Sequence, residues 1–249
     1  MAIKLRTAEE IENIKKACQI VAEVLEEIKT EVKAGVLTEN LDKLAEEKIR
    51  ARGAYPVFLG YHGYKNATCI SINNEIVHGI PGKRVIKDGD IVSLDIGAKI
   101  EGYCGDAAIT ILVGEVCKAA AKLVKTCRQS LEKGIRQVRA GNHLGDISSA
   151  IQKHAEKEGY SVVRELYGHG VGEDLHEDPL IPNFGNPGEG PILKPGMVLA
   201  IEPMLNIGSW KIRTLDDGWT IVTADGSLSS HFEHTVLVTE KGSEILTKI

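Results

Sequence analysis

DIVSLDIGAKIEGYCGDAAITILV, residues Asp90–Val113, predicts two strands joined by a tight turn. Apolar residues alternate with small or polar ones along both arms, which is typical of strands with one buried face. We expect the turn to centre on Ile100–Glu101, which would place Asp95 directly opposite Asp106. Two carboxylates about 5 Å apart across a strand pair repel each other. A shared proton or a bound cation is needed between them, so the hairpin predicts a functional site.

The composition bounds the class of protein. The chain has 249 residues, 26% of them charged and 43% hydrophobic, as in ordinary globular proteins. A formal net charge of −5 argues against nucleic-acid binding, and no apolar run is long enough to span a membrane. The five cysteines are odd in number and form no CxxC pair, which favours reduced thiols over disulfides or a thiolate zinc site. We therefore expect a cytoplasmic protein without nucleic-acid specificity or membrane association.

Helical and strand patterns follow one another twice along the chain. A capping-box pattern at Thr7–Glu10 begins a first helix, and a second is expected over Thr38–Arg52. Helical spacing returns over residues 116–131 and again over Leu144–Glu158, and each pair of helices is followed by β patterns. Outside the hairpin the expected strands are Thr68–Ile72, Val162–Tyr167, Met197–Leu205, Trp219–Thr223 and Phe232–Val238.

Matches at a nearly constant spacing indicate an internal duplication. VKAG at residues 32–35 resembles VRAG at 138–141, at an offset of 106. GDIVSLD, which ends at Asp95, resembles GMVLAIE, which ends at Glu202, at an offset of 107. The duplication predicts that each half contributes a carboxylate to one site.

No linker rich in proline or serine separates the two halves. We therefore expect residues 1–249 to form a single α+β catalytic domain, with pseudo-symmetric halves at about 1–114 and 115–249. The two halves should be related by a pseudo-twofold axis.

Three residues of the second half add to the set of candidate ligands. Glu202 precedes Pro203, which cannot donate to a sheet ladder, so the strand there should be bulged or at an edge. Glu233 alternates with its neighbours in SSHFEHTVLV and should share a face with His231 and Thr235. His169 lies in YGHGVG, where glycines allow a close approach of the backbone.

Each of these residues alone is more often an ordinary surface residue than a ligand. Together, four carboxylates and one histidine form a ligand shell dominated by oxygen. Two divalent cations would neutralise its four negative charges. Such a shell suits Mn, Fe, Co or Zn in a two-metal centre.

Motifs along nearly the whole chain resemble those of the type I methionine aminopeptidases of the pita-bread metallopeptidase fold. The motifs are GYHGY, HGIP, SLDIGA, GYCGDAA, YGHGVG followed by LHEDP, AIEPM, DGWT and FEHT. The resemblance implies twofold-related halves with helices packed on a curved, mainly antiparallel sheet. It also implies a centre of two divalent metal ions (Co, Mn, Fe or Zn) held by Asp95, Asp106, His169, Glu202 and Glu233.

The resemblance implies an activity as well. Such an enzyme removes the initiator methionine from nascent proteins and peptides, preferring a small second residue, by attack of a metal-activated water on the first peptide bond. Glu202 would pass a proton to the leaving amine. His176 would polarise the carbonyl and stabilise the oxyanion, and His78 would contact the peptide near the scissile amide. Crowding near both histidines would select small second residues.

The methionine side chain needs an apolar, adaptable pocket. Positions that line this pocket in the family are matched here by Tyr61, Tyr64, Cys69 and Trp219, with Phe58, His62 and Leu175 nearby. Ordinary core packing is the alternative explanation for Phe58 and Leu175.

Two other functions are compatible with the same scaffold. Proline-specific aminopeptidases and dipeptidases share the five ligands, but they usually carry a large amino-terminal domain that we do not expect here. The aromatic set of Tyr61, Tyr64 and Trp219 also favours methionine. A non-catalytic binding module would typically lose metal ligands, whereas all five are present. We expect a monomer that acts on nascent polypeptides, with the ribosome as a candidate partner.

Overall fold

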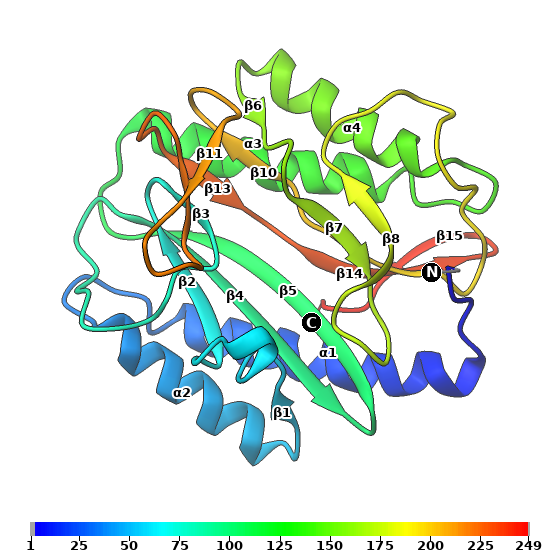
Figure 1. Cartoon of the computed structure of the whole chain (residues 1–249), viewed down its shortest axis with the longest axis horizontal. Helices are drawn as coiled ribbons and strands as arrows, with labels where there is room; N and C mark the ends of the chain where they lie inside the picture. The colour runs from blue at the N-terminus through cyan, green and yellow to red at the C-terminus, as the bar shows by residue number, and fades with distance from the viewer. Residues whose placement is uncertain (1–2, 249) are drawn as a thin grey trace.

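The computed structural model describes residues 3–248 (Figure 1). Two pairs of helices flank the strands, one pair in each half of the chain. Among the described residues, no helix has the length and apolar character needed to cross a membrane. The helices are α1 (Ala8–Lys29), α2 (Thr38–Ala51), α3 (Lys118–Ile135) and α4 (Leu144–Lys157), with a short 3-10 helix η1 (Tyr61–Gly63).

The strands are short except for the long hairpin of β4 and β5. Those of the first half are β1 (Tyr55–Pro56), β2 (Thr68–Ile72), β3 (Glu75–Val77), β4 (Ile91–Ile100) and β5 (Tyr103–Leu112). Those of the second half are β6 (Ser161–Val162), β7 (Tyr167–Gly170), β8 (Glu177–Pro182), β9 (Val198–Ile201), β10 (Met204–Asn206), β11 (Ile212–Thr214), β12 (Ile221–Thr223), β13 (Ser229–His231), β14 (His234–Thr239) and β15 (Gly242–Ile245).

Local sequence signals determine the helix ends as predicted. The Thr7 side chain accepts a hydrogen bond from the Glu10 backbone N–H, and the Glu10 carboxylate accepts one from the Thr7 backbone N–H. This capping box satisfies two amides at the start of α1. Gly53 (φ 76°) and Gly159 (φ 89°) follow α2 and α4 in the left-handed conformation that ends helices.

The hairpin is confirmed, but its predicted turn is wrong. Glu101 (φ 51°) and Gly102 (φ 86°) form the turn, and their positive φ values match the twist of a two-residue hairpin. Asp95 therefore pairs with Ala108 instead of Asp106. The register differs from the prediction by two residues, and the side-chain period of a strand is also two. Asp95 and Asp106 thus remain on one face, as diagonal neighbours.

The backbone repeats the duplication seen in the sequence. An isolated bridge joins Leu37 to Val85 in the first half, and an equivalent bridge joins His143 to Ile192. The N–H groups of the preceding glycines also bond at matching places. Gly35 donates to Ile86 at 2.8 Å, and Gly141 donates to Leu193 at 3.0 Å. The offsets of these pairs are the 106 and 107 of the sequence matches.

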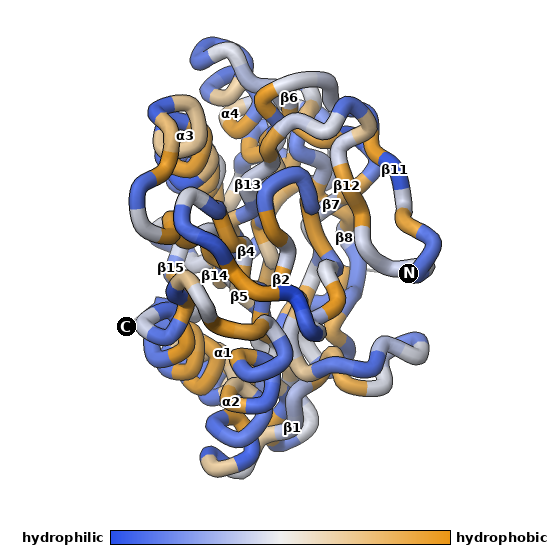
Figure 2. The backbone as a smooth tube through the Cα atoms, turned by 90° about the vertical axis from the view of Figure 1, so that its left-hand side faces the viewer, coloured by the Kyte–Doolittle hydropathy of each residue, from blue (hydrophilic) through white to orange (hydrophobic). Residues whose placement is uncertain are grey.

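The two halves pack their helices against one side of a curved set of mainly antiparallel strands. In Figure 2, α1 and α3 lie along one side of the strands, and β11 and β12 lie on the other. Each half has its own apolar core, one around α1 and α2 and one around α3 and α4. Ile109 of β5 contacts both cores. This strand therefore joins the halves.

A seam between β5 and the segment before β14 brings the halves together. Glu233 donates its backbone N–H to Ala108 at 2.8 Å and accepts the N–H of Ala108 at 3.4 Å. Beside it, the Thr235 hydroxyl donates to the Asp106 carbonyl at 2.8 Å and accepts the Asp106 N–H at 3.3 Å. The seam places the candidate residues of both halves at one point.

Candidate active site

Glu202 and Glu233 lie at matching interruptions of two paired strands. The predicted strand Met197–Leu205 is broken at Glu202-Pro203, between β9 and β10. The predicted strand at Phe232–Val238 starts only at His234, so Glu233 lies outside it, between β13 and β14. The pairing register is the same on both sides of the break, which places Glu202 opposite Glu233. The directly opposed carboxylates are therefore the glutamates rather than the aspartates.

Neighbouring groups satisfy the backbone at this interruption. The Pro203 carbonyl accepts hydrogen bonds from the Phe232 N–H at 3.4 Å and the Cys127 thiol of α3 at 3.3 Å. The Asn183 side-chain amide donates to the Glu202 carbonyl at 3.2 Å. The prediction of a bulge or an edge strand at Pro203 is therefore wrong, because the strand is interrupted without a change of register and its two parts, β9 and β10, lie inside their sheets.

His169 on β7 faces the carboxylates with an unprotonated nitrogen. Its Nδ1 lies 3.0 Å from the Gly170 carbonyl, which can only accept, so Nδ1 carries the proton. Nε2 then presents a lone pair 3.6 Å from Glu202 Oε1 and 4.0 Å from Asp106 Oδ2. Flanking glycines allow this position, because a Cβ at Gly168 would collide with the backbone of the adjacent strand. Three acceptors that face one another require a cation or a shared proton between them.

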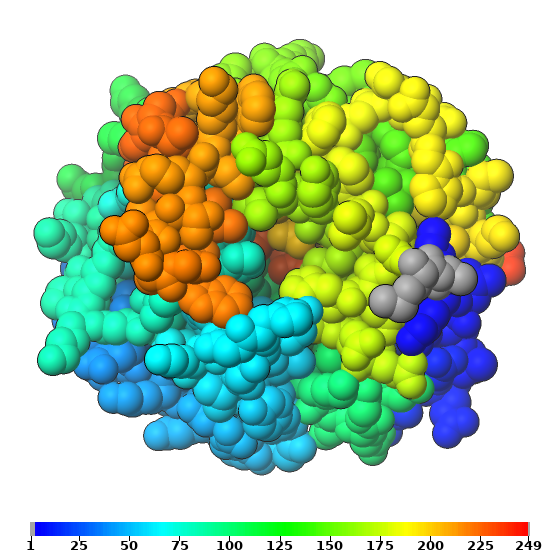
Figure 3. Space-filling model, viewed as in Figure 1, coloured from blue at the N-terminus to red at the C-terminus, as the bar shows by residue number. Residues whose placement is uncertain are grey.

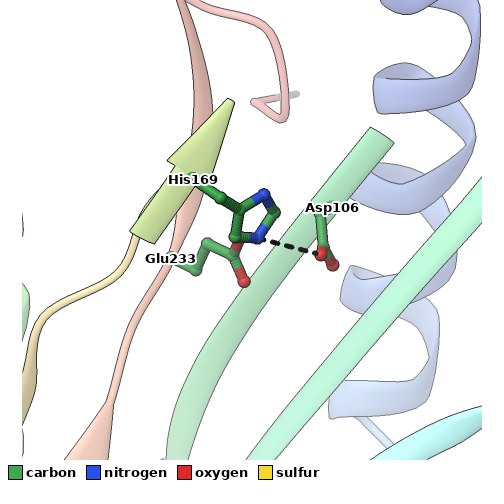
Figure 4. Close-up of side chains that lie close together, drawn as sticks. All are labelled: Asp106, His169 and Glu233. Carbon is green, nitrogen blue, oxygen red and sulfur yellow. Dashed lines mark ion pairs between the residues drawn. The ribbon is translucent and has the colours of Figure 1, made fainter. Parts of the chain in front are cut away.

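Asp106, His169 and Glu233 form a buried cluster whose ligand atoms all lie within 4.8 Å of one another (Figure 4). Among the described residues, no hydrogen-bond partner reaches Oδ1 of Asp95, Oδ1 of Asp106 or Oε1 of Glu233. Unpaired buried carboxylate oxygens are costly. A divalent cation would satisfy these oxygens, and oxygen and imidazole nitrogen are suitable ligands for it. The residues present therefore fit a metal centre.

The electrostatics of the cluster agree with this fit. Burial raises the pKa of Asp95 to about 7, and the Glu202 carboxylate adds to the shift. Burial, followed by repulsion from Asp95, raises the pKa of Asp106 well above its usual range. The pKa of Glu233 is raised well above its usual value by burial and by Asp106, and burial also raises that of Glu202. Burial among like charges thus favours the protonated forms of these carboxyls when no cation is bound.

His176 and His78 lie beside the cluster. The Tyr61 hydroxyl is 2.6 Å from Nδ1 of His176, and the His176 ring packs edge-on against His169 with centroids 4.3 Å apart. Partial desolvation lowers the pKa of His176 to about 4, and His62 contributes to the shift. Burial likewise lowers the pKa of His78 to about 4. Both imidazoles are neutral near pH 7.

His78 has an unusual backbone conformation, with φ at 59°. A non-glycine residue in this region costs on the order of 1 kcal/mol, and such residues cluster at active sites. Its ring lies edge-on to Trp219, with centroids 6.5 Å apart. The strained turn thus directs the imidazole toward the aromatic part of the site.

A pocket opens above the carboxylates. Figure 3 shows it as a hollow near the centre of the visible face, bordered by segments from both halves. The structure brings nearly all predicted site residues to its wall. The lining residues are Phe58, Tyr61, Tyr64, Cys69, Val77, His78, Asp95, Asp106, His169, Leu175, His176, Glu202, Trp219 and Glu233.

His62 is the predicted residue that does not line this pocket. It is exposed, and its ring lies edge-on to Tyr61 with centroids 4.4 Å apart. Two residues of the site region, Val77 and His231, were not predicted. Val77 contributes to the wall, and no sequence pattern distinguishes it from a core valine. His231 lies behind Glu202, and its alternation with Glu233 was the available signal.

The apolar part of the pocket is rigidly built. The Tyr64 hydroxyl donates to the carbonyls of Thr68 at 3.0 Å and Gly79 at 3.1 Å. The Tyr64 ring packs edge-on against Trp219 with centroids 5.0 Å apart. Phe58 lies against β4 at Gly97, where a Cβ would come within 2.7 Å of its ring. The chamber is therefore apolar and lies directly beside the carboxylates.

The fold and site together define a class. The sequence profile of metallopeptidase family M24 matches residues 12–240, which include all five candidate ligands. The chain belongs to metallopeptidase family M24. Its fold is the pita-bread fold of that family, and the family indicates a divalent metal cofactor.

Relatives place the chain within the family. Methionine aminopeptidase 1 of Bacillus subtilis (strain 168) is 52% identical over 244 residues, covering 98% of each sequence. A methionine aminopeptidase of Clostridium perfringens is 50% identical over 247 residues, covering 99% of each. Among the members of family M24, the chain thus groups with the methionine aminopeptidases.

Solved structures of similar proteins support the same grouping. The crystal structure of methionine aminopeptidase from Thermotoga maritima has a TM-score of 0.98 and 48% identity, and each chain is covered completely. Prolidase from Pyrococcus furiosus has a TM-score of 0.81 and 26% identity, covering 98% of this chain and 65% of that one. The fold is shared with prolidase, but the identity is higher for the methionine aminopeptidase.

Proposed function

We propose that this chain is a metal-dependent methionyl aminopeptidase, which hydrolyses the first peptide bond of peptides that begin with methionine. One observation carries the proposal. The buried cluster of Asp106, His169 and Glu233 opens directly into an apolar chamber walled by Tyr64 and Trp219. A metal cluster beside a pocket for an unbranched apolar side chain fits removal of a single methionine.

We assign the metal ligands to Asp95, Asp106, His169, Glu202 and Glu233. The unpartnered oxygens of three of these residues and the free Nε2 of His169 support the assignment. Their four carboxylates balance two divalent cations, for which Co, Mn, Fe and Zn are suitable. Bound metal supplies a water of lowered pKa as the nucleophile.

The remaining chemistry belongs to side chains of the pocket. Glu202 accepts the proton of the attacking water and delivers it to the leaving amine. The Tyr61 hydroxyl donates to Nδ1 of neutral His176, which leaves an N–H on Nε2. That N–H stabilises the oxyanion that forms at the scissile carbonyl. His78 holds the peptide beside the scissile amide.

Selectivity follows from the two parts of the pocket. The methionine side chain is received by Phe58, Tyr61, Tyr64, Cys69, Leu175 and Trp219, with His62 packed against Tyr61 nearby. The second residue lies between His78 and His176, where the space favours a small side chain.

We further propose that residues 1–249 act as one catalytic domain, with halves at about 1–114 and 115–249. The seam between Ala108 and Glu233 supports this arrangement, because the metal cluster draws on both halves. The domain acts as a cytoplasmic monomer on nascent polypeptides, some of them at the ribosome.

The test compares three peptides. The holoenzyme should release methionine from a Met-Ala-Ser peptide, much faster than from Met-Leu-Ser, and leave an Xaa-Pro peptide intact. Cleavage of Xaa-Pro in place of Met-Ala-Ser would overturn the proposal in favour of a proline-specific enzyme of the same fold.

A further inference from the structure

His231 on β13 lies beside the site without lining the pocket. Its side chain is buried, with 2% of the residue exposed. Its Nε2 lies 3.4 Å from Oε2 of Glu202. Among the described residues, this nitrogen makes no hydrogen bond. The carboxylate of Glu202 is therefore the polar group available to it.

Glu202 lies between the imidazoles of His169 and His231, which face its two carboxylate oxygens. On one side, Oε1 faces Nε2 of His169, which carries a lone pair because Nδ1 donates to the Gly170 carbonyl. Two acceptors face each other there, so a cation belongs between them. On the other side, Oε2 faces His231, which lies outside the cluster able to hold a metal. A proton on Nε2 of His231 is the favourable arrangement at that side.

The backbone of His231 is fixed in place by Thr110. The Thr110 hydroxyl donates to the His231 carbonyl at 2.7 Å and accepts the His231 N–H at 3.0 Å. The hydroxyls of Ser93 and Ser230 lie 2.9 and 3.0 Å from the hydroxyl oxygen of Thr110. All four residues are buried. The imidazole thus projects from a rigid point on the seam between the halves.

We propose that His231 is a positioning residue, which donates its Nε2 proton to Oε2 of Glu202. This holds the carboxylate so that Oε1 faces the metal side of the site. The inference rests on the proposed function for the role of Glu202. Partners of metal-ligating groups in other proteins contribute on the order of 10–100-fold to metal affinity or activity.

Two substitutions of His231 carry the same amide group on side chains of different length, so they test whether the N–H must reach Glu202. Glutamine places its amide N–H at about the distance of the histidine Nε2, whereas asparagine places it only at that of Nδ1. We expect His231→Gln to keep the Co²⁺ affinity and kcat of the wild type. His231→Asn should weaken Co²⁺ affinity by on the order of 10–100-fold and lower kcat, with KM for Met-Ala-Ser little changed. Calorimetry and the visible absorption of the Co²⁺-loaded protein measure the metal site independently of turnover.

A double-mutant cycle with Glu202→Ala keeps the test decisive where a variant is less stable. If His231 acts through Glu202, His231→Asn should add no further loss of Co²⁺ affinity in that background. Three results would overturn the proposal: full Co²⁺ affinity in His231→Asn, equal impairment of both single variants, or loss of a metal equivalent in His231→Gln. Wild-type protein that binds Co²⁺ but leaves Met-Ala-Ser intact would instead overturn the proposed function.

Discussion

Asp106 and Glu233 come from different halves of the chain, yet their side chains meet in one buried cluster with His169. The seam explains the meeting, because Ala108 and Glu233 exchange two backbone hydrogen bonds only two residues from Asp106. Neither half alone assembles the cluster. Metal binding should therefore stabilise the joined halves as a unit.

Replacing Asp106 by asparagine tests the metal cluster. The Asp106→Asn variant keeps the size of the side chain but removes one ligand and one buried charge. We expect loss of metal binding and activity, while the metal-free variant should be at least as stable as the wild type, because its neutral amide does not have to take up a proton on burial. Wild-type protein at 100 times the metal Kd should gain about 2.7 kcal/mol, and the variant nothing.

Thermal unfolding with and without Mn²⁺ measures this difference. Glu47→Gln is the matched control, because it removes one charge from an exposed position of α2. A metal-dependent stabilisation of Asp106→Asn equal to that of the wild type would show that Asp106 is not a ligand.

Metal binding should depend on pH in a specific direction. The pKa of Asp95 is raised to about 7 in the metal-free protein, so its carboxyl holds a proton below that pH. A metal must displace the proton, and affinity should rise as the pH increases through about 7. His169 does not contribute, because burial lowers its pKa to about 3.

Calorimetry in two buffers with different ionisation enthalpies counts the protons released. We expect at least one per protein at pH 6. The same linkage acts on the metal-free fold. Protonated Asp95 contributes stability below its unfolded pKa of about 4, and the contribution is lost as the pH rises through about 7. Affinity that is flat from pH 6 to 8, without proton release, would contradict the assignment.

His176 should affect turnover but not metal content. His176→Ala removes the oxyanion donor and should lower kcat by on the order of 10²–10³-fold. Tyr61→Phe removes the hydroxyl that lies 2.6 Å from Nδ1 and should lower kcat by about tenfold. Tyr55→Phe is the control, because the Tyr55 hydroxyl donates to the Leu59 carbonyl at 2.8 Å and Tyr55 is not one of the residues that line the pocket. Metal analysis and steady-state kinetics on the same samples test this prediction. Loss of metal in His176→Ala would show that the role of His176 is structural.

Gly105 tests how the fold supports Asp106. A Cβ at Gly105 would come within 2.6 Å of the Cys18 backbone nitrogen, so α1 and β5 pack backbone to backbone. We expect Gly105→Ala to lower the free energy of unfolding by about 1–3 kcal/mol in urea. Gly82→Ala serves as the control, because, apart from its two chain neighbours, no described residue has a heavy atom within 4 Å of the added Cβ. Equal stability of the two variants would mean that α1 moves aside easily.

Local signals made much of the fold predictable from the sequence. The capping box at Thr7, the terminating glycine at position 53 and the strand Thr68–Ile72 are all confirmed. The duplication was readable because both halves keep equivalent turns. The turn of the hairpin was mispredicted because Glu101 adopts a positive φ, a conformation that residue rarely takes.

The site was predictable by motif rather than by geometry. Nothing local showed that Glu202 and Glu233 occupy opposed breaks, because that relationship depends on pairing between distant strands. The role of His231 was equally hard to predict from local sequence. The histidine meets Glu202 only through the tertiary arrangement of β10 and β13.

The central claim is most directly tested by metal removal and restoration on one peptide. Protein treated with a chelator should leave Met-Ala-Ser intact, and added Mn²⁺ or Co²⁺ should restore the release of a single methionine, with metal analysis giving the equivalents bound. Full activity in the presence of the chelator, or restored cleavage of Xaa-Pro alone, would contradict a metal-dependent methionyl aminopeptidase.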